Sequence, residues 1–193
     1  MRVLLLYAHP VETSYAAALH ERALAVLQAH GHDVDDCDLY TEGFDAVMSR
    51  QERLDYHDTA INHTPVAAHV ERLLAAEALI TLSPIWNFGV PAILKGYMDR
   101  VFLPGVTFRL QEGRIGPGAL ALKRLVCIHT YGAKRWVAWA AGDPPRRQLM
   151  RVVGGLLAPN APKRYLGLYD MNNATPAHRA AFLARVEAEM AQF

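Results

Sequence analysis

Cysteine is scarce in this chain of 193 residues, which contains only Cys37 and Cys127. A small scaffold held together by several disulfides is therefore excluded. Both cysteines fall in runs that are typical of strands, so we expect two buried thiols in a reducing compartment. An excess of one charge is also missing, because 20 basic residues face 19 acidic ones, for a net charge of +1. This balance argues against a nucleic-acid partner and against attraction to an anionic membrane.

Long apolar runs are absent as well. The longest uncharged run, residues 78–94, is interrupted by Pro84, Asn87, Gly89 and Pro91, whereas a membrane-spanning helix needs roughly 20 apolar residues. The N-terminal segment runs straight into a His-Pro turn without the cleavage region of a signal peptide. We therefore expect no membrane insertion and a cytoplasmic location.

What the chain does contain is an alternation of apolar strands and amphipathic helices, with 52% hydrophobic residues overall. Five strands separated by helices imply right-handed crossovers and a parallel sheet that is covered on both faces. We expect a single α/β domain over residues 1–193, with a doubly wound sheet in the flavodoxin-like strand order 2-1-3-4-5. Periodicity and turn residues predict strands at 2–8, 33–39, 78–82, 124–130 and 164–168, helices at 15–29, 65–75, 92–101, 146–157 and 176–192, and a hairpin or loop at 103–118.

The stretch at residues 83–102 contains an aromatic loop directly after the third predicted strand. Pro84 is expected to end that strand, because proline donates no hydrogen bond to a ladder. Pro91 is expected to open the next helix at its first position. The loop between them lies at the carboxyl end of a strand, where open α/β sheets bind ligands. From the residues alone, Trp86 and Phe88 either pack against a flat aromatic ligand or belong to the core.

Two further loops, at residues 9–15 and 130–134, follow predicted strands at the same edge of the sheet. The first leads into a helix N-terminus, whose free N–H groups and dipole suit a phosphate. Thr13 and Ser14 add hydroxyl groups, and His9 adds a charge-assisted donor. Thr13 and Ser14 equally suit an ordinary helix cap. Serine occurs only at positions 14, 49 and 83, and the presence of two of the three at these loops slightly favours the phosphate.

Three segments of the chain together resemble a known family. They are His9-Pro10-x-x-Thr13-Ser14-Tyr15, the block Trp-Asn-Phe-Gly-Val-Pro-Ala-Ile-Leu-Lys-Gly-Tyr-Met-Asp-Arg-Val-Phe at residues 86–102, and Thr130-Tyr131-Gly132. The pattern is similar to the NAD(P)H:quinone oxidoreductase family, the DT-diaphorase-like members of the flavodoxin-like fold. The resemblance runs from residue 2 to about residue 132 and continues loosely toward the C-terminus.

The resemblance implies a bound flavin, either FAD or FMN. The implied cofactor-binding residues are His9, Thr13, Ser14 and Tyr15 at the phosphate or pyrophosphate, Pro84, Ile85, Trp86, Asn87 and Phe88 along the isoalloxazine edge, and Thr130, Tyr131 and Gly132 on its other side. It also implies a homodimer that passes hydride from NAD(P)H to the flavin and then to a small-molecule, quinone-like electron acceptor. Ping-pong kinetics is expected, because both substrates need the same face of the ring.

The protein's own contribution to catalysis is expected to be modest. Neither a nucleophile elbow nor paired histidines at metal spacing occur, so we expect no metal and assign the chemistry to the cofactor. Backbone N–H donors would stabilise negative charge on the reduced ring. We assign this catalytic role to Trp86, Asn87 and Tyr131.

The chain departs from the larger quinone reductases after residue 129. Those enzymes have a Thr-Thr-Gly-Gly loop followed by a tyrosine and a histidine that face the acceptor, whereas here His129-Thr130-Tyr131-Gly132 is followed by no nearby histidine. Two alternatives therefore stay open. One is an azo- or nitro-compound reductase that uses the same site, and the other is a regulatory nucleotide- or flavin-binding ancillary subunit of a transporter. We interpret most of the nine histidines as surface or capping residues.

Overall fold

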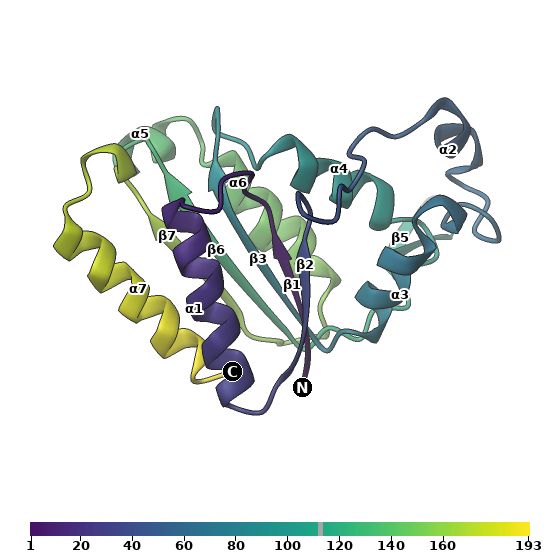
Figure 1. Ribbon diagram of the computed structural model, residues 1–193. Helices are drawn as coiled ribbons and strands as arrows, with labels where there is room; N and C mark the ends of the chain where they lie inside the picture. Colours follow the sequence, from purple (N-terminus) through teal and green to yellow (C-terminus); the bar gives the residue numbers. More distant parts are fainter. Residues whose placement is uncertain (112–113) are drawn as a thin grey trace.

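The computed structural model describes residues 1–111 and 114–193 and has a five-stranded parallel sheet in the order β2-β1-β3-β6-β7 (Figure 1). Strands β4 and β5 form a separate antiparallel hairpin, so the order within the main sheet is 2-1-3-4-5 and the expected flavodoxin-like class is confirmed. The strands are β1 Arg2–Tyr7, β2 Asp33–Asp38, β3 Ala78–Ile85, β4 Phe108–Gln111, β5 Arg114–Pro117, β6 Arg124–Tyr131 and β7 Lys163–Leu168.

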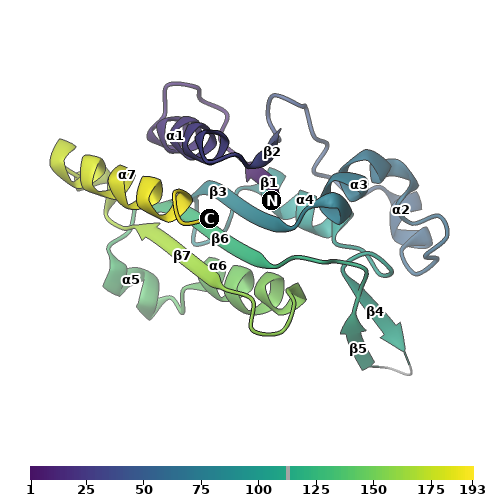
Figure 2. The same cartoon turned by 90° about the horizontal axis from the view of Figure 1, so that it is seen from below.

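The helices divide between the two faces of the sheet. Helices α1 and α7 pack on each other and cover one face, while α3, α4 and the helical segment 144–156 cover the other (Figure 2). The α-helices are α1 Tyr15–Ala29, α2 Arg50–Asp55, α3 Ala67–Ala75, α4 Ala92–Val101, α5 Arg135–Ala140, α6 Pro144–Arg147 and α7 Pro176–Met190. Short 3₁₀ turns lie at Thr64–Val66, Val153–Leu156 and Met171–Asn173, and a π-helical turn lies at Gln148–Val152.

The central strands are buried on both faces, because alternate side chains enter two different cores. In β1, Leu4 and Leu6 belong to the core under α3 and α4, whereas Val3 and Leu5 belong to the core under α1 and α7. The continuous apolar run of this strand therefore reflects helices on both sides of a parallel sheet. Cys37 and Cys127 are buried and form no disulfide.

Strand β3 continues through Pro84, which corrects the prediction that this proline ends it. Pro84 is paired with Thr130 of β6. The carbonyl of Leu82 accepts a hydrogen bond from Ala8 on the β1 side, and Pro84, two residues further along, presents its nitrogen to that same side. Because β1 has already ended at Tyr7, the missing N–H of Pro84 removes no ladder bond.

Two helix predictions also need correction. Pro91 is the N-cap of α4, and the first helical residue is Ala92. The segment expected as one helix at 146–157 instead passes from α6 through a π-helical turn into a 3₁₀ turn. This last turn contains Gly154 and Gly155, which disfavour a regular α-helix, and a Cβ at Gly154 would lie 2.7 Å from the side chain of Lys163 on β7.

The hairpin or loop expected at 103–118 includes the hairpin of β4 and β5, which extends from the body of the molecule in Figure 2. Residues 112–113 of that segment lie outside the described residues. Within the described ranges, none of the helices has both the length and the apolar character that crossing a lipid bilayer requires.

Candidate functional site

Three loops that follow β1, β3 and β6 lie side by side at one edge of the sheet, the upper edge in Figure 1. The imidazole of His9, after β1, lies 5.9 Å from the indole of Trp86, after β3, with the rings edge to face at 61°. The register pairs Ile85 of β3 with Tyr131 of β6, so the loops after these two strands begin at the same level.

The loop after β1 presents hydrogen-bond donors at the start of α1. Ser14 is the N-cap, and its hydroxyl oxygen accepts from the N–H of Ala17 at 3.1 Å, which leaves the hydroxyl proton to donate elsewhere. Thr13 is exposed beside it. The Nδ1 of His9 accepts from the N–H of Val11 at 3.0 Å, so in the neutral ring the proton lies on Nε2, which remains a donor.

The side chain of Tyr15 makes a structural contact with α7 and does not contribute to this edge of the sheet. Its hydroxyl donates to the carbonyl oxygen of Arg179 at 2.6 Å, which ties the start of α1 to α7. Burial raises the pKa of Tyr15 to about 12, so this phenol stays protonated at neutral pH. The part of Tyr15 that faces outward at the helix start is its backbone N–H, which has no acceptor within the helix.

Residues 86–89 form a two-residue hairpin turn. The N–H of Gly89 donates to the carbonyl of Trp86 and the N–H of Trp86 donates to the carbonyl of Gly89, both at 2.9 Å. Asn87 and Phe88, with φ of 49° and 56°, are in the left-handed region that a type I′ turn requires. Asparagine adopts this region readily, whereas a bulky aromatic residue there is strained.

This turn corrects one predicted role and leaves another in place. The N–H of Trp86 is used inside the turn, so it is not a donor for a ligand. The N–H groups of Asn87 and Phe88 point out of a type I′ turn and have no partner among the described residues. Trp86 retains its side chain for contact, because the indole is 44% exposed.

The remaining predicted residues lie mostly beneath the surface. Pro84, Ile85 and Thr130 are buried. Gly132 is exposed, and a Cβ at this position would approach the side chain of Asn172 to 3.2 Å.

The phenol of Tyr131 is engaged inside the protein, which removes it from the predicted site. Its hydroxyl donates to Asp143 Oδ1 at 2.9 Å and contacts the hydroxyl of Tyr165, and its ring stacks on Tyr169 with 4.4 Å between centroids. Burial, with these neighbours, raises the pKa of Tyr131. Asp143, which the sequence analysis did not single out, is held at a φ of 44° on the loop before α6. Only the backbone of Tyr131 is left for the predicted donor role.

His129, to which the sequence assigned no role, lies on β6 and is fully buried. Its ring contacts Ser83 and Thr81, and burial lowers its pKa to about 4. It is an exception to the interpretation of most histidines as surface or capping residues. Its place inside a predicted apolar strand was the available signal, because a histidine there must be neutral and hydrogen-bonded.

The residues at this edge fit an anionic group attached to a flat ring. The first turn of α1 has no acidic side chain, so the positive end of the helix dipole and its free N–H groups are available to an external anion. Ser14 and His9 add two side-chain donors at the same place. The exposed indole of Trp86 and the outward N–H groups of the adjoining turn suit the face and the carbonyl edge of a polar aromatic ring.

A neighbouring cavity of about 440 Å³ on the β2 side is unsuited to the anion. Glu12, Glu21 and Asp38 are among its lining residues, and carboxylates repel a phosphate. His9 lines this cavity as well and contacts Trp86 on the β3 side, so the donors of the β1 loop lie between the acidic cavity and the exposed indole.

The comparisons with known proteins concern the fold and the family of the chain. The family model described as "Flavodoxin-like fold" matches residues 1–188. The ribosyldihydronicotinamide dehydrogenase-like protein traD of Penicillium crustosum is 33% identical over 155 residues, which cover 68% of this chain and 58% of the relative. The FMN-dependent NADH:quinone oxidoreductase of Beijerinckia indica subsp. indica is 31% identical over 87 residues, which cover 44% of this chain and 43% of that protein.

Among solved structures, the NAD(P)H:quinone oxidoreductase of Methanothermobacter marburgensis superposes with a TM-score of 0.84. It is 24% identical and the superposition covers 99% of this chain and 98% of that one, which supports the fold. The chain spans less than two thirds of the length of the two curated relatives above. Because the family model matches nearly the whole chain and the sheet has the corresponding strand order, the chain belongs to the flavodoxin-like fold family.

Proposed function

We propose that this chain is a flavin-dependent NAD(P)H oxidoreductase that reduces quinone-like acceptors by two electrons. The observation that carries the proposal is the convergence, at one sheet edge, of a helix start without acidic side chains, an exposed indole and two outward N–H groups. The names of the relatives, which include an FMN-dependent NADH:quinone oxidoreductase, support the same chemistry.

The residues divide into two functional groups. Ser14, Thr13 and His9 hold the phosphate of the cofactor through hydroxyl and imidazole donors, together with the N–H groups of the first turn of α1. Trp86 packs against the ring, and the N–H groups of Asn87 and Phe88 donate to its polar edge. A bound flavin supplies hydride acceptance from a reduced nicotinamide and hydride donation to an acceptor.

The protein's catalytic contribution is electrostatic. N–H groups held in a strained turn do not have to reorient when negative charge develops beside them, so they favour the reduced state of the ring over the oxidised one. We propose that the nicotinamide and the acceptor use the same exposed face in turn, which gives ping-pong kinetics.

We further propose that the protein is a homodimer in the cytoplasm. On α5, Trp136 and Trp139 are 68% and 79% exposed and lie three residues apart on the helix. Two large aromatic side chains exposed on neighbouring helix positions form an apolar patch, and exposed apolar patches mark interaction sites. Light scattering coupled to size-exclusion chromatography measures the oligomeric state directly.

The decisive experiment is the visible spectrum of the purified protein. We expect a yellow protein with flavin absorption bands, and the mass of the released cofactor identifies FMN or FAD. Steady-state assays with NADH and NADPH, against quinones, azo dyes and nitroaromatics, are expected to show turnover with parallel double-reciprocal lines. Colourless protein that takes up neither flavin on titration would refute the proposal. A yellow protein without turnover would refute the enzymatic part and favour the ancillary-subunit alternative.

A further inference from the structure

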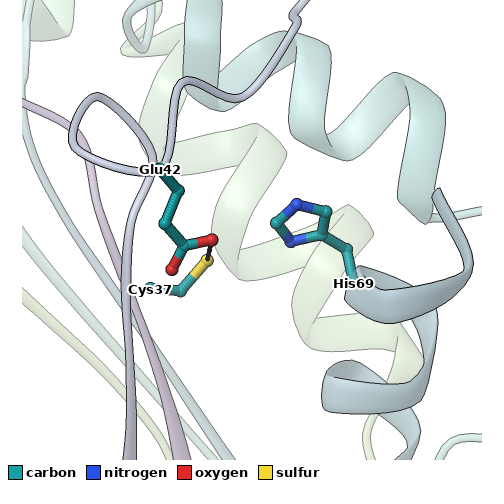
Figure 3. Close-up of side chains that lie close together, drawn as sticks. All are labelled: Cys37, Glu42 and His69. Atoms are coloured by element: carbon teal, nitrogen blue, oxygen red, sulfur yellow. Dashed lines mark hydrogen bonds between the residues drawn. The ribbon is translucent and has the colours of Figure 1, made fainter.

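Three side chains of metal-ligating types lie together on the face of the sheet covered by α3 and α4 (Figure 3). Cys37 is on β2, Glu42 is on the loop that follows, and His69 is on α3. One potential ligand atom of each lies within 4.8 Å of those of the other two. In Figure 3 the carboxylate and the thiol face the imidazole across a short gap.

The carboxylate of Glu42 is held in place by neighbours. The Cys37 thiol donates to Glu42 Oε2 at 3.8 Å, and Arg72 Nη1 donates to the same oxygen at 2.7 Å. Arg72 also donates through Nε and Nη2 to Asp35 Oδ1, at 2.9 and 2.7 Å. Arg72 is thus shared between Asp35 and Glu42. Oε1 of Glu42 accepts from neither Cys37 nor Arg72, so its lone pairs are available to another partner.

Two buried polar atoms beside this group lack a partner among the described residues. They are Nδ1 of His69 and Oη of Tyr97. Tyr97 is fully buried, and its ring lies 5.5 Å from that of His69, while the ring of Phe44 lies 4.9 Å from the same imidazole. The burial of an unsatisfied polar group costs about 1–3 kcal/mol, so two such atoms at one place indicate a missing partner.

We propose that Cys37, Glu42 and His69 bind a divalent cation of the zinc class. A thiolate, an imidazole nitrogen and a carboxylate oxygen are ligands of borderline-soft cations, and their combination disfavours Mg²⁺ and Ca²⁺. On binding, the thiol proton passes to the solvent, and the two negative ligands neutralise the two charges of the cation. The fourth coordination position is left to water, for which the hydroxyl of Tyr97 is a neighbouring partner.

Only small movements are needed to close the site. Tetrahedral zinc with bonds of about 2.0–2.3 Å separates its ligand atoms by roughly 3.5 Å, and the Cys37–Glu42 separation is already 3.8 Å. The Glu42 side chain is 31% exposed, which gives the cation a route from solvent. A bound cation would pin the loop after β2 to α3, so its role is structural and independent of the proposed cofactor site.

The test measures zinc binding by the whole chain, which is purified and then stripped of metal with a chelator. We expect one Zn²⁺ per chain by competition with a chromogenic chelator, a higher unfolding temperature with zinc, and a sulfur scatterer at about 2.3 Å in zinc X-ray absorption spectra. Cys37→Ser and His69→Gln are each expected to weaken binding by roughly 100-fold or more.

Matched controls separate this site from other histidines and thiols. Cys127→Ser changes the other buried thiol, and His178→Gln changes an exposed histidine; neither is expected to change zinc affinity. His69 is only half-buried, so its variant stays informative if Cys37→Ser fails to fold. The proposal is overturned if zinc affinity is equal in wild type and in His69→Gln, or if the bound zinc has no sulfur neighbour. A buried water is then the partner of His69 Nδ1 and Tyr97 Oη.

Discussion

His129 on β6 and Ser83 on β3 are paired in the sheet, each two residues before the last residue of its strand. The Nδ1 of His129 lies 3.0 Å from both the carbonyl and the hydroxyl oxygen of Ser83, and its Nε2 lies 3.2 Å from the hydroxyl of Thr81. A carbonyl only accepts, so Nδ1 carries the proton and Nε2 accepts from Thr81. This contact holds the ends of the two strands level, and His129 is therefore a positioning residue.

The buried imidazole predicts a loss of stability in mild acid. Burial lowers the pKa of His129 to about 4, whereas in the unfolded chain it is about 6.5. As the pH falls below about 6.5, the unfolded state takes up the proton first, so stability declines down to about pH 4, by about 3 kcal/mol in total. We expect urea unfolding to show about 2 kcal/mol of this loss at pH 5.

The variant His129→Gln isolates this contribution. It is expected to be less stable at pH 7.5 but to lose less stability between pH 7.5 and pH 5 than the wild type. The pKa values of His69 and His32 are also lowered, but these groups contribute equally in both proteins. Parallel profiles for wild type and His129→Gln would show that His129 does not titrate in this way.

The cap of α1 is expected to serve both the helix and the ligand. Ser14→Ala removes a hydroxyl that accepts from a helix N–H, which costs about 1 kcal/mol of stability. Thr175→Ala removes the equivalent cap of α7, where the hydroxyl accepts from the N–H of His178. We expect both variants to lose similar stability in urea unfolding, but only Ser14→Ala to bind FMN more weakly in a fluorescence titration. Equal FMN affinity in the two variants would place the phosphate away from α1.

The left-handed backbone conformation of Asn87 is expected to restrict which residue types this position tolerates. A β-branched residue there costs about 1–2 kcal/mol, so Asn87→Val is expected to lower both stability and flavin affinity. Asn87→Gly keeps the N–H and the conformation, and is expected to preserve both. Asn160, with a φ of 64° on an exposed loop, is the matched control. We expect Asn160→Val to lower stability without lowering flavin affinity. If Asn160→Val and Asn87→Val lose the same flavin affinity, general destabilisation is the cause.

The exposed indole of Trp86 is expected to contribute contact energy to the ligand and little to the fold. Trp86→Ala should weaken flavin binding by about fivefold, corresponding to about 1 kcal/mol of aromatic contact, while the midpoint of thermal unfolding of the flavin-free protein stays close to that of wild type. Trp139→Ala removes an indole of greater exposure on α5 and is expected to leave flavin affinity unchanged. An unaltered affinity in Trp86→Ala would exclude the indole from the ligand contact.

Contacts between residues that are far apart in the sequence could not be predicted from the sequence. Arg100, buried near the end of α4, forms an ion pair with Glu52 of α2 at 2.6 Å. Glu52 also closes a capping box with Ser49. The two residues are 48 positions apart in the sequence, and no periodic signal connects them. The group formed by Cys37, Glu42 and His69 escaped for the same reason, because the three residues share no metal-binding spacing.

The strand order, the two-sided covering of the sheet and the three loops at its edge could be predicted from the chain before its structure was known. They follow from local periodicity, turn residues and the handedness of crossovers, which are local properties of the chain. Which polar groups remain free for a ligand depends on the folded arrangement. The N–H of Trp86 is used by Gly89, and the phenol of Tyr131 is used by Asp143. The reason is that each donor is satisfied by whichever acceptor the folded chain brings near it, and that partner is set by distances in space instead of positions in sequence.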